Sequence, residues 1–534
     1  MSKKIFKSVI VFWVLIAQTA TAQDVFNQPV VIKQLKKHIG YLADDKLEGR
    51  RTGTKGEMLA AKYISAQFKK HKIAPAGTNQ YLQPFTVHDG RSIDASSSIS
   101  INGIVLQAHT DYFPLTVSGN GTFNGQAVWF DTKTFATQLK DNPHLLIIEE
   151  VRKAGARAEA AGKPLIVYNS GLISDELAWD AKSRITPLSV PVIYLHPDAM
   201  RKHSIIPEQT PVQVKLQFNT LTRTGHNVVG YIDNGAEYTI VLGAHYDHLG
   251  YGEDKNSMYT GSVPMIHNGA DDNASGTAAM LELSRMLRKS AFKKNNYLFV
   301  AFSGEELGLY GSRHFVENYS GTRNINYMIN MDMVGRAADS ARKLTIGGFG
   351  TSPVWGELIK KENCLFDLKI DSSGSGPSDH TSFYKKDIPV LFFFTGTHFD
   401  YHKPSDDADK ISYFGTSEIV RYIYNLIGKT ESYGKLSFLK TKEPEMGRTS
   451  FKVTMGILID YTFTGKGVYV DGVTDGRPAS KAGVQRGDIL QKMGDHTISD
   501  VSSYMQALNK FNKGETITIQ VKRGEDNVLL PLTF

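Results

Sequence analysis

The stretch from residue 227 to about 428 limits the possible folds most strongly, because short apolar runs alternate there with helical periodicity. Four of these runs carry no charge and have the length of strands: 239–243, 297–302, 325–330 and 389–394. Helical segments are expected at 273–289, 305–317 and 415–427. Runs that are apolar throughout are typical of parallel strands covered on both faces. The pattern therefore predicts an α/β domain with a mixed, mostly parallel sheet flanked by helices.

Changes in residue pattern before and after this stretch predict further structural units. Residues 30–75 are mainly helical in pattern, 96–222 contain short β-rich runs and one alanine-rich helix, and a charged linker precedes a compact β-rich end. The predicted division is 1–22 signal peptide, 23–95 N-terminal helical part of the α/β domain, 96–222 inserted unit, 223–435 α/β domain, 436–448 linker and 449–534 C-terminal unit.

The first 22 residues have the pattern of a signal peptide. Three lysines stand before a short apolar run, and Ala20-Thr21-Ala22 has the small-x-small form of a cleavage site, so a mature chain starting at Gln23 is expected. An uncleaved anchor is the alternative, but the run is short for a bilayer and no second long apolar stretch follows. We therefore expect an exported protein, periplasmic or extracellular, without a membrane span after cleavage.

Charge and cysteine content exclude several classes of protein. The formal charge is +7, and removal of the three leader lysines leaves +4, spread without a Lys/Arg block. This gives no support to nucleic-acid binding. Cys364 is the only cysteine, which excludes an intramolecular disulfide and a cysteine-rich zinc site.

Acidic residues and histidines follow strand after strand in the α/β domain. They form five motifs: Ala244-His245-Tyr246-Asp247-His248, Gly269-Ala270-Asp271-Asp272-Asn273-Ala274-Ser275-Gly276, Ser303-Gly304-Glu305-Glu306, Asn330-Met331-Asp332-Met333 and Tyr401-His402-Lys403-Pro404-Ser405-Asp406. Each alone is a weak signal, because a His-x-Asp or Glu-Glu pair is usually a solvated surface feature. In α/β sheets, however, groups beyond the carboxyl ends of strands converge, so the repetition predicts a shared cation.

The residue types suit a pair of zinc ions. Imidazole and carboxylate are good zinc ligands, and two ions about 3.5–4 Å apart need a bridging ligand, for which a carboxylate is suited. A water that they bind becomes acidic enough to react at neutral pH. Glu305 and Glu306 point in opposite directions in extended backbone, so one ligand and one uncoordinated proton acceptor is the natural division.

The five motifs resemble those of the zinc-dependent aminopeptidase family that includes secreted bacterial leucyl aminopeptidases, glutamate carboxypeptidase II and, as a non-catalytic relative, the transferrin receptor. The resemblance implies two zinc ions per chain, one held by His245 and Asp332, the other by Glu306 and His402, with Asp272 as the bridge.

The same resemblance implies several supporting roles. Glu305 would be the general acid/base, and Asp247 and Asp406 would orient His245 and His402. It also implies a cis peptide bond between Asp272 and Asn273, and a pocket-lining role for the stretch Ser378-Asp379-His380. His248 and His398 are rival ligands on residue type, and only the motif match selects His245 and His402.

The flanking units resemble known modules as well. Residues 96–222 resemble a protease-associated domain, which would limit substrate size or act as a purely structural lid. Residues 449–534 resemble a bacterial-type PDZ domain, in which Met455, Gly456, Ile457 and Leu458 would bind the C-terminal carboxylate of a peptide by strand addition. The alternative is a unit that only packs on the catalytic domain.

These inferences favour an exported two-zinc metallopeptidase that removes amino acids from peptides with a free N-terminus. Carboxypeptidase or dipeptidase action is an alternative. Glutaminyl cyclisation with one zinc is disfavoured, because such a site would not need His245 and Asp332. A non-catalytic binding protein predicts lost ligands, and none of the five is missing.

Overall fold

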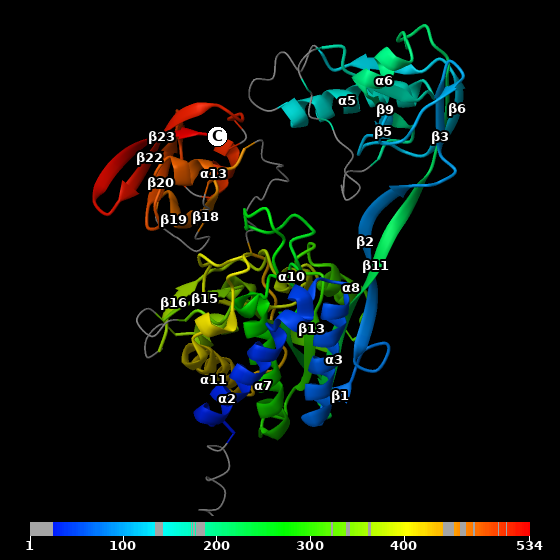
Figure 1. Cartoon of the computed structure of the whole chain (residues 1–534). Helices are drawn as coiled ribbons and strands as arrows, with labels where there is room; N and C mark the ends of the chain where they lie inside the picture. Colours follow the sequence, from blue (N-terminus) through cyan, green and yellow to red (C-terminus); the bar gives the residue numbers. More distant parts are fainter. Residues whose placement is uncertain are drawn as a thin grey trace, which may run out of the picture.

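The computed structural model describes residues 25–133, 143–171, 174, 177, 187–321, 324–337, 342–360, 365–441, 453–459, 466–473, 476–499, 501–508 and 510–534. The expected signal peptide lies outside the described residues. The chain forms a large α/β unit, a β-rich insert and a small C-terminal unit (Figure 1). Across the residues that the structure describes, none of the helices combines the length and apolar character needed to span a bilayer.

The α/β unit is built on one mixed sheet with the order β1-β11-β13-β12-β14-β17-β15-β16, and β2 pairs with β11. Its four central strands are parallel: β13 (Asn296–Phe302), β12 (Thr239–His245), β14 (Ile325–Met331) and β17 (Val390–Phe394). On one side β11 (Phe218–Ile232) is antiparallel to β13, and β1 (Ala74–Pro75) and β2 (Leu82–Ile93) are antiparallel to β11. On the other side β15 (Lys343–Gly347) is antiparallel to β17, and β16 (Asp367–Ile370) is parallel to β15. The predicted fold class is confirmed.

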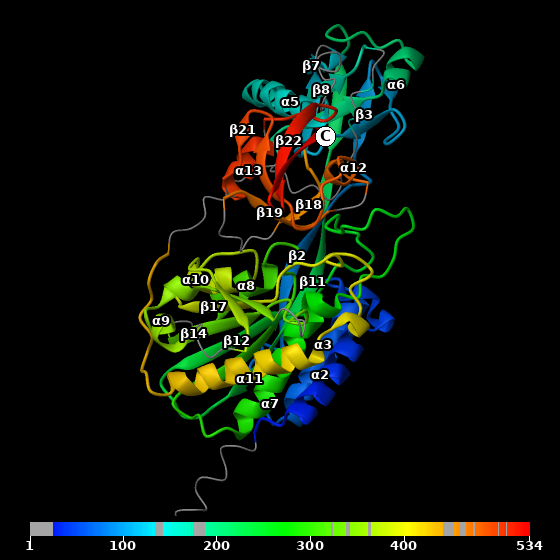
Figure 2. The same ribbon diagram turned by 90° about the vertical axis from the view of Figure 1, so that its left-hand side faces the viewer.

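Helices cover both faces of this sheet (Figure 2). One face carries α2 (Gln28–Leu42), α3 (Lys55–Lys70), α7 (Gly276–Lys289) and α11 (Tyr413–Thr430), and the other carries α8 (Tyr310–Asn318) and α10 (His380–Tyr384). Alternate side chains of β13 accordingly enter two cores, with Phe299 on the first face and Leu298 and Val300 on the second. This double burial explains why the strand is apolar from Tyr297 to Phe302. The short α9 (Val354–Leu358) lies between β15 and β16.

Two helices begin later than their periodicity predicts, and both delays occur at the motif residues. The expected helix from 305 begins at Tyr310, because Gly304 and Leu309 have positive φ angles of 71° and 62° and the backbone N–H of Glu305 donates to Asp247. The expected helix from 273 begins at Gly276, after a distorted turn at Ala270–Ser275 (η2). The peptide bond between Asp272 and Asn273 is cis, as expected.

The insert is carried by a long two-stranded ribbon. Strands β2 and β11 pair from Ile93–Phe218 to Leu82–Val228, so the expected boundary at residue 222 falls inside one continuous strand. Beyond the ribbon lie two small sheets, β4-β3-β10-β6 and β5-β9-β8-β7. Their elements are β3 (Ser98–Ile101), β4 (Ile104–Val105), β5 (Tyr112–Pro114), β6 (Gly121–Gly125), β7 (Val128–Asp131), α5 (Pro143–Ala160), β8 (Leu165–Tyr168), β9 (Val192–Leu195), α6 (Pro197–Lys202) and β10 (Val212–Leu216).

The C-terminal unit has its own core, in which Val470, Leu490 and Ile519 are fully buried. Its sheet has the order β18-β19-β20-β22-β23, with β21 paired with β20. The elements are β18 (Ile457–Ile459), β19 (Val468–Val473), α12 (Pro478–Lys481), β20 (Ile489–Met493), β21 (His496–Thr497), α13 (Val501–Leu508), β22 (Thr516–Arg523) and β23 (Asp526–Thr533).

Candidate metal centre

The five expected ligands meet at the carboxyl ends of the central strands. His245 is the last residue of β12, Asp332 directly follows β14, and Glu306 lies in the loop after β13. Asp272 lies in the turn before α7, and His402 lies in the loop between β17 and α11. Parallel strands aligned side by side bring their carboxyl ends to one edge, which is why residues so distant in sequence converge.

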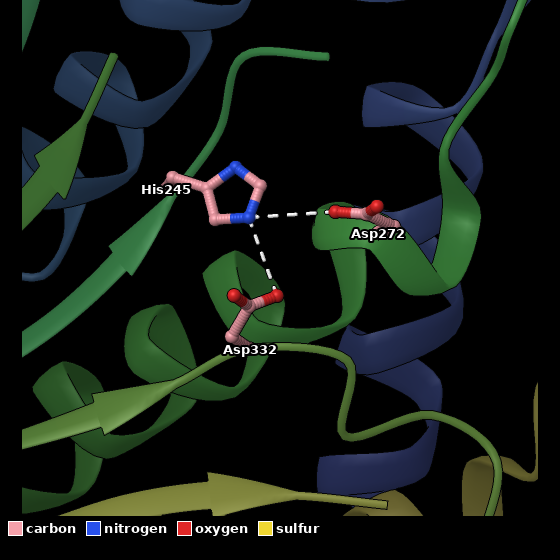
Figure 3. Close-up of side chains that lie close together, drawn as sticks. All are labelled: His245, Asp272 and Asp332. Carbon is pink, nitrogen blue, oxygen red and sulfur yellow. Dashed lines mark hydrogen bonds and ion pairs between the residues drawn. The ribbon is translucent and has the colours of Figure 1, made fainter. Parts of the chain in front are cut away.

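The first group joins His245 to two carboxylates (Figure 3). Its Nε2 atom lies 3.2 Å from Oδ1 of Asp332 and 3.4 Å from Oδ1 of Asp272. Burial opposes a charge on His245, yet the carboxylates of Asp332 and Glu305 raise its pKa well above the usual value. The group is thus a concentration of negative charge that favours a cation.

The second group joins His402 to two carboxylates in the same way. Its Nε2 atom lies 3.3 Å from Oδ2 of Asp272 and 3.2 Å from Oε2 of Glu306. Asp272 therefore directs one oxygen towards each imidazole. A carboxylate in this position has the arrangement that a ligand shared by two ions requires.

The spacing of the donor atoms fits zinc. With bonds of about 2.0–2.1 Å, two ligand atoms of a tetrahedral zinc ion lie about 3.3–3.4 Å apart. The four nitrogen–oxygen separations within the two groups are 3.2, 3.4, 3.3 and 3.2 Å. Both groups therefore have the size and the N/O chemistry of a zinc site.

Hydrogen bonds at the opposite ring atoms fix both imidazoles. The Nδ1 atom of His402 lies 2.8 Å from the carbonyl oxygen of Asn256, and Nδ1 of His245 lies 3.2 Å from that of Asp247. Because an Nδ1–H that donates to a carbonyl leaves the Nε2 lone pair available, both rings present Nε2 as the donor atom.

The two expected supporting carboxylates have different surroundings. The Oδ1 atom of Asp247 is 3.7 Å from Nδ1 of His245, close to the expected position. Asp406 is not paired with His402: its Oδ2 accepts from the backbone N–H groups of Asp271 and Asp272, at 2.9 and 3.0 Å. The expected pairing is replaced because Asn256 already occupies Nδ1 of His402, so Asp406 holds the turn of the bridging aspartate instead.

Glu305 lies beside the first group without joining it. Burial raises the pKa of its carboxyl well above the ordinary value, and Asp332 and Glu306 add to the shift, whereas His245 opposes it. A carboxyl group that is close to the cluster and has a raised pKa is suited to accept a proton and to release it again.

The two rival histidines differ in their positions. Nε2 of His398 lies 3.1 Å from Oδ2 of Asp271, outside both groups. His248 does enter the second group, because an atom of its ring lies within 4.8 Å of Asp272 and Glu306. Its Nδ1, however, is 2.8 Å from Glu306 and 3.9 Å from Asp272, and neither distance equals the separation of two zinc ligands.

Two further residues support the centre and were not singled out by sequence reasoning. Asn256 is one, through its carbonyl. Arg50 is the other: it is fully buried and donates to backbone carbonyls on both sides of the site, including Tyr246 and Gly269. From the sequence, residues 30–75 are expected only to be mainly helical, and an arginine in a polar, glycine-bearing stretch carries no signal of its buried position.

Ser378, in the stretch of expected pocket residues, also contacts the centre. Its hydroxyl donates to Oδ2 of Asp332 at 2.7 Å and accepts from the side-chain amide of Asn330 at 2.8 Å. The other oxygen of Asp332 remains directed at His245.

The expected carboxylate-binding loop of the C-terminal unit lies at a sheet edge. Met455 is buried and its carbonyl accepts from Ala479, Gly456 has a φ of 75°, and Ile457 and Leu458 begin β18. Among the described strands, β18 pairs only with β19 and stands at the end of its sheet.

Residues 227–427 match peptidase family M28 and residues 449–533 match the PDZ domain. The chain is 27% identical over 409 residues to aminopeptidase YwaD of Bacillus subtilis, covering 71% of this chain and 79% of that protein. It is 28% identical over 219 residues to leucine aminopeptidase 1 of Trichophyton rubrum, covering 38% of this chain but only 56% of that protein. A solved zinc aminopeptidase from Bacillus subtilis, BSAP, aligns with a TM-score of 0.44 at 22% identity, covering 77% and 96% of the two chains.

Proposed function

We propose that this chain is an aminopeptidase that hydrolyses the N-terminal peptide bond of peptides, with two zinc ions as cofactors; the match of residues 227–427 to peptidase family M28 supports this. His245 and Asp332 would hold one ion and Glu306 and His402 the other, and Asp272 would contribute an oxygen to each. The observation that carries the proposal is that the two carboxylate oxygens of Asp272 face different histidines: Oδ1 lies 3.4 Å from Nε2 of His245, and Oδ2 lies 3.3 Å from Nε2 of His402.

Bound zinc supplies Lewis acidity, which lowers the pKa of water from 15.7 towards about 7. The protein supplies position and a proton carrier. The carbonyls of Asp247 and Asn256 keep both Nε2 atoms directed inwards. Glu305 takes the proton of the attacking water on its carboxylate and delivers it to the leaving amine, which its raised pKa and lack of a role as a ligand allow.

Two measurements test this function. Zinc analysis of the purified protein should give about two ions per chain. A peptide with a free N-terminus should be cleaved one residue at a time, whereas the same peptide with an acetylated N-terminus should not. Equal cleavage of both would eliminate the aminopeptidase assignment while leaving a peptidase.

We propose that the protein is exported and that the signal peptide is removed after Ala22. The support is the charge and apolar pattern of the first residues. N-terminal sequencing of protein recovered from the periplasm or the medium should begin at Gln23. Recovery of a mature chain that begins at Met1 would contradict the proposal.

We propose further roles for the two flanking units. The PDZ domain binds peptide C-termini at Met455–Leu458 by strand addition, which the position of β18 at the end of the described sheet supports. The insert is a protease-associated domain that limits substrate size. A series of peptides of increasing length should then show a falling kcat/KM, and a constant value would argue for a purely structural insert.

A further inference from the structure

His248 is a buried imidazole at the metal centre to which the motif assigns no role. It lies three residues after His245, in the loop that follows β12, and its side chain is fully buried. Its Nδ1 lies 2.8 Å from Oε1 of Glu306. Since this separation is that of a hydrogen bond, the ring donates its Nδ1–H to a carboxylate that faces His402 with its other oxygen.

The two oxygens of Glu306 are therefore divided between two histidines. Oε1 accepts from His248 at 2.8 Å, and Oε2 lies 3.2 Å from Nε2 of His402. A carboxylate whose one oxygen is held by a donor presents only the other to a cation. A ligand that uses one oxygen leaves a coordination position open, as a hydrolytic zinc site requires.

Two further segments of the chain hold the imidazole in this position. The backbone N–H of His248 donates to the carbonyl of Arg50 at 3.3 Å. Gly269, with a φ of 54°, packs directly on the ring, and a Cβ atom there would come within 2.5 Å of the ring carbon Cδ2. Nε2 is buried and has no hydrogen-bond partner among the described residues, so the ring is fixed by packing and directed by one polar contact.

From this geometry we infer that His248 is a positioning residue, which holds Glu306 in its one-oxygen orientation and is not itself a metal ligand. The inference rests on the proposed zinc site. It assigns His248 to the hydrogen bond with Glu306 and leaves His402 as the histidine of the second group.

Two matched substitutions separate the positioning role from ligation. In His248→Asn the side-chain amide places an N–H where Nδ1 lies, whereas in His248→Gln it reaches the position of Nε2. Both variants keep an amide in the same buried space. His402→Asn is the control for a lost ligand, because its amide cannot reach the position of Nε2.

The measurement is the rate of zinc release from the full-length protein to a chromogenic chelator, together with the zinc content after dialysis. We expect His248→Asn to release zinc within about threefold of the wild-type rate and His248→Gln to lose one ion about 10–100-fold more readily, the usual effect of removing an outer-shell partner. His402→Asn should lose that ion altogether.

Three outcomes would overturn the inference. Loss of zinc from His248→Asn as complete as from His402→Asn would make His248 a ligand. Wild-type release from His248→Gln would show that the hydrogen bond does not position Glu306, and a lower melting temperature of both metal-free variants without faster release would indicate a structural role only. The wild-type zinc content tests the proposed function separately, because its failure would be seen before any variant is compared.

Discussion

Replacing Arg50 with methionine should destabilise the α/β unit strongly, because the guanidinium is the shared donor of several buried carbonyls. Arg50 is fully buried and donates to the carbonyls of Leu42, Tyr246, Asn268 and Gly269. Burial lowers the pKa of Arg50 to about 10, while carboxylates of the metal centre oppose the shift, so the side chain stays charged at neutral pH. No carboxylate of the described residues forms an ion pair with it at contact distance.

The magnitude follows from the hydrogen bonds that are lost. Each bond from a charged donor contributes about 1.5–3 kcal/mol, but deleting the cation also removes the cost of burying it. The net loss expected for Arg50→Met is therefore about 3–5 kcal/mol, below the sum of the four bonds. Arg50→Lys keeps the charge but has one compact head with three donors, so its loss should be roughly half as large.

Urea unfolding of the chelator-treated protein measures this loss without a contribution from metal binding. Hydrogen exchange in β12 and β14 should be followed, since the separate units need not unfold together. Arg313→Met is the matched control, because this exposed arginine donates to the carbonyl of Leu309, the residue before α8, and lies over the ring of Tyr310, without reaching the metal centre. A free energy of unfolding for Arg50→Met within about 1 kcal/mol of the wild type would refute the reasoning.

Three further predictions concern other parts of the chain. Glu305→Gln should keep its zinc but lose about 10²–10⁴-fold in kcat, and wild-type turnover would mean that the proton carrier is a different group. Asp254 is half-buried, and despite the opposing effect of burial, its contacts with Arg51 and Arg223 lower its pKa from 3.8 to about 2. Because the pKa is lower in the folded state, the ionised carboxylate stabilises the fold fully above about pH 4, and this stabilisation is lost as the pH falls through 2. Asp254→Asn should therefore lower the free energy of unfolding by about 1–2 kcal/mol at pH 6 and by little at pH 2. Unfolding measured as a function of pH would detect the difference. A peptide with a free C-terminal carboxylate should bind the PDZ domain and its C-terminally amidated form should not; calorimetry showing equal binding would contradict carboxylate recognition at Met455–Leu458.

The fold of the α/β unit was predictable because burial on both faces leaves a signal in each central strand. The runs at 239–243, 297–302 and 325–330 lie within β12, β13 and β14 almost residue for residue. Local propensity was less informative at the motifs. Residues 305–309 have helical periodicity, but the Glu305 backbone is bound to Asp247, and this long-range contact delays the helix until Tyr310.

The predicted ligands shared a recognisable chemistry, whereas their supports did not. A histidine or carboxylate directly after an apolar run is unusual, so it can be recognised in the sequence as a candidate ligand. The residues that orient it often act through the backbone, as the carbonyl of Asn256 does for His402, and any residue type can supply a carbonyl. The prediction for Asp406 shows the consequence, because its side-chain chemistry suited His402 while a carbonyl already held the ring.

The contacts of Arg50 and His248 join parts of the chain that are far apart in sequence, and this explains why the N-terminal helices belong to the same folding unit as the metal centre. The carbonyl of Arg50 accepts from His248, and its guanidinium donates to Gly269, the residue that packs on the His248 ring. Displacement of the loop around Arg50 would therefore release two parts of the site at once: His248, which holds Glu306, and the turn that carries Asp272. Metal affinity and the stability of this loop should be coupled, although no residue of the loop is a ligand.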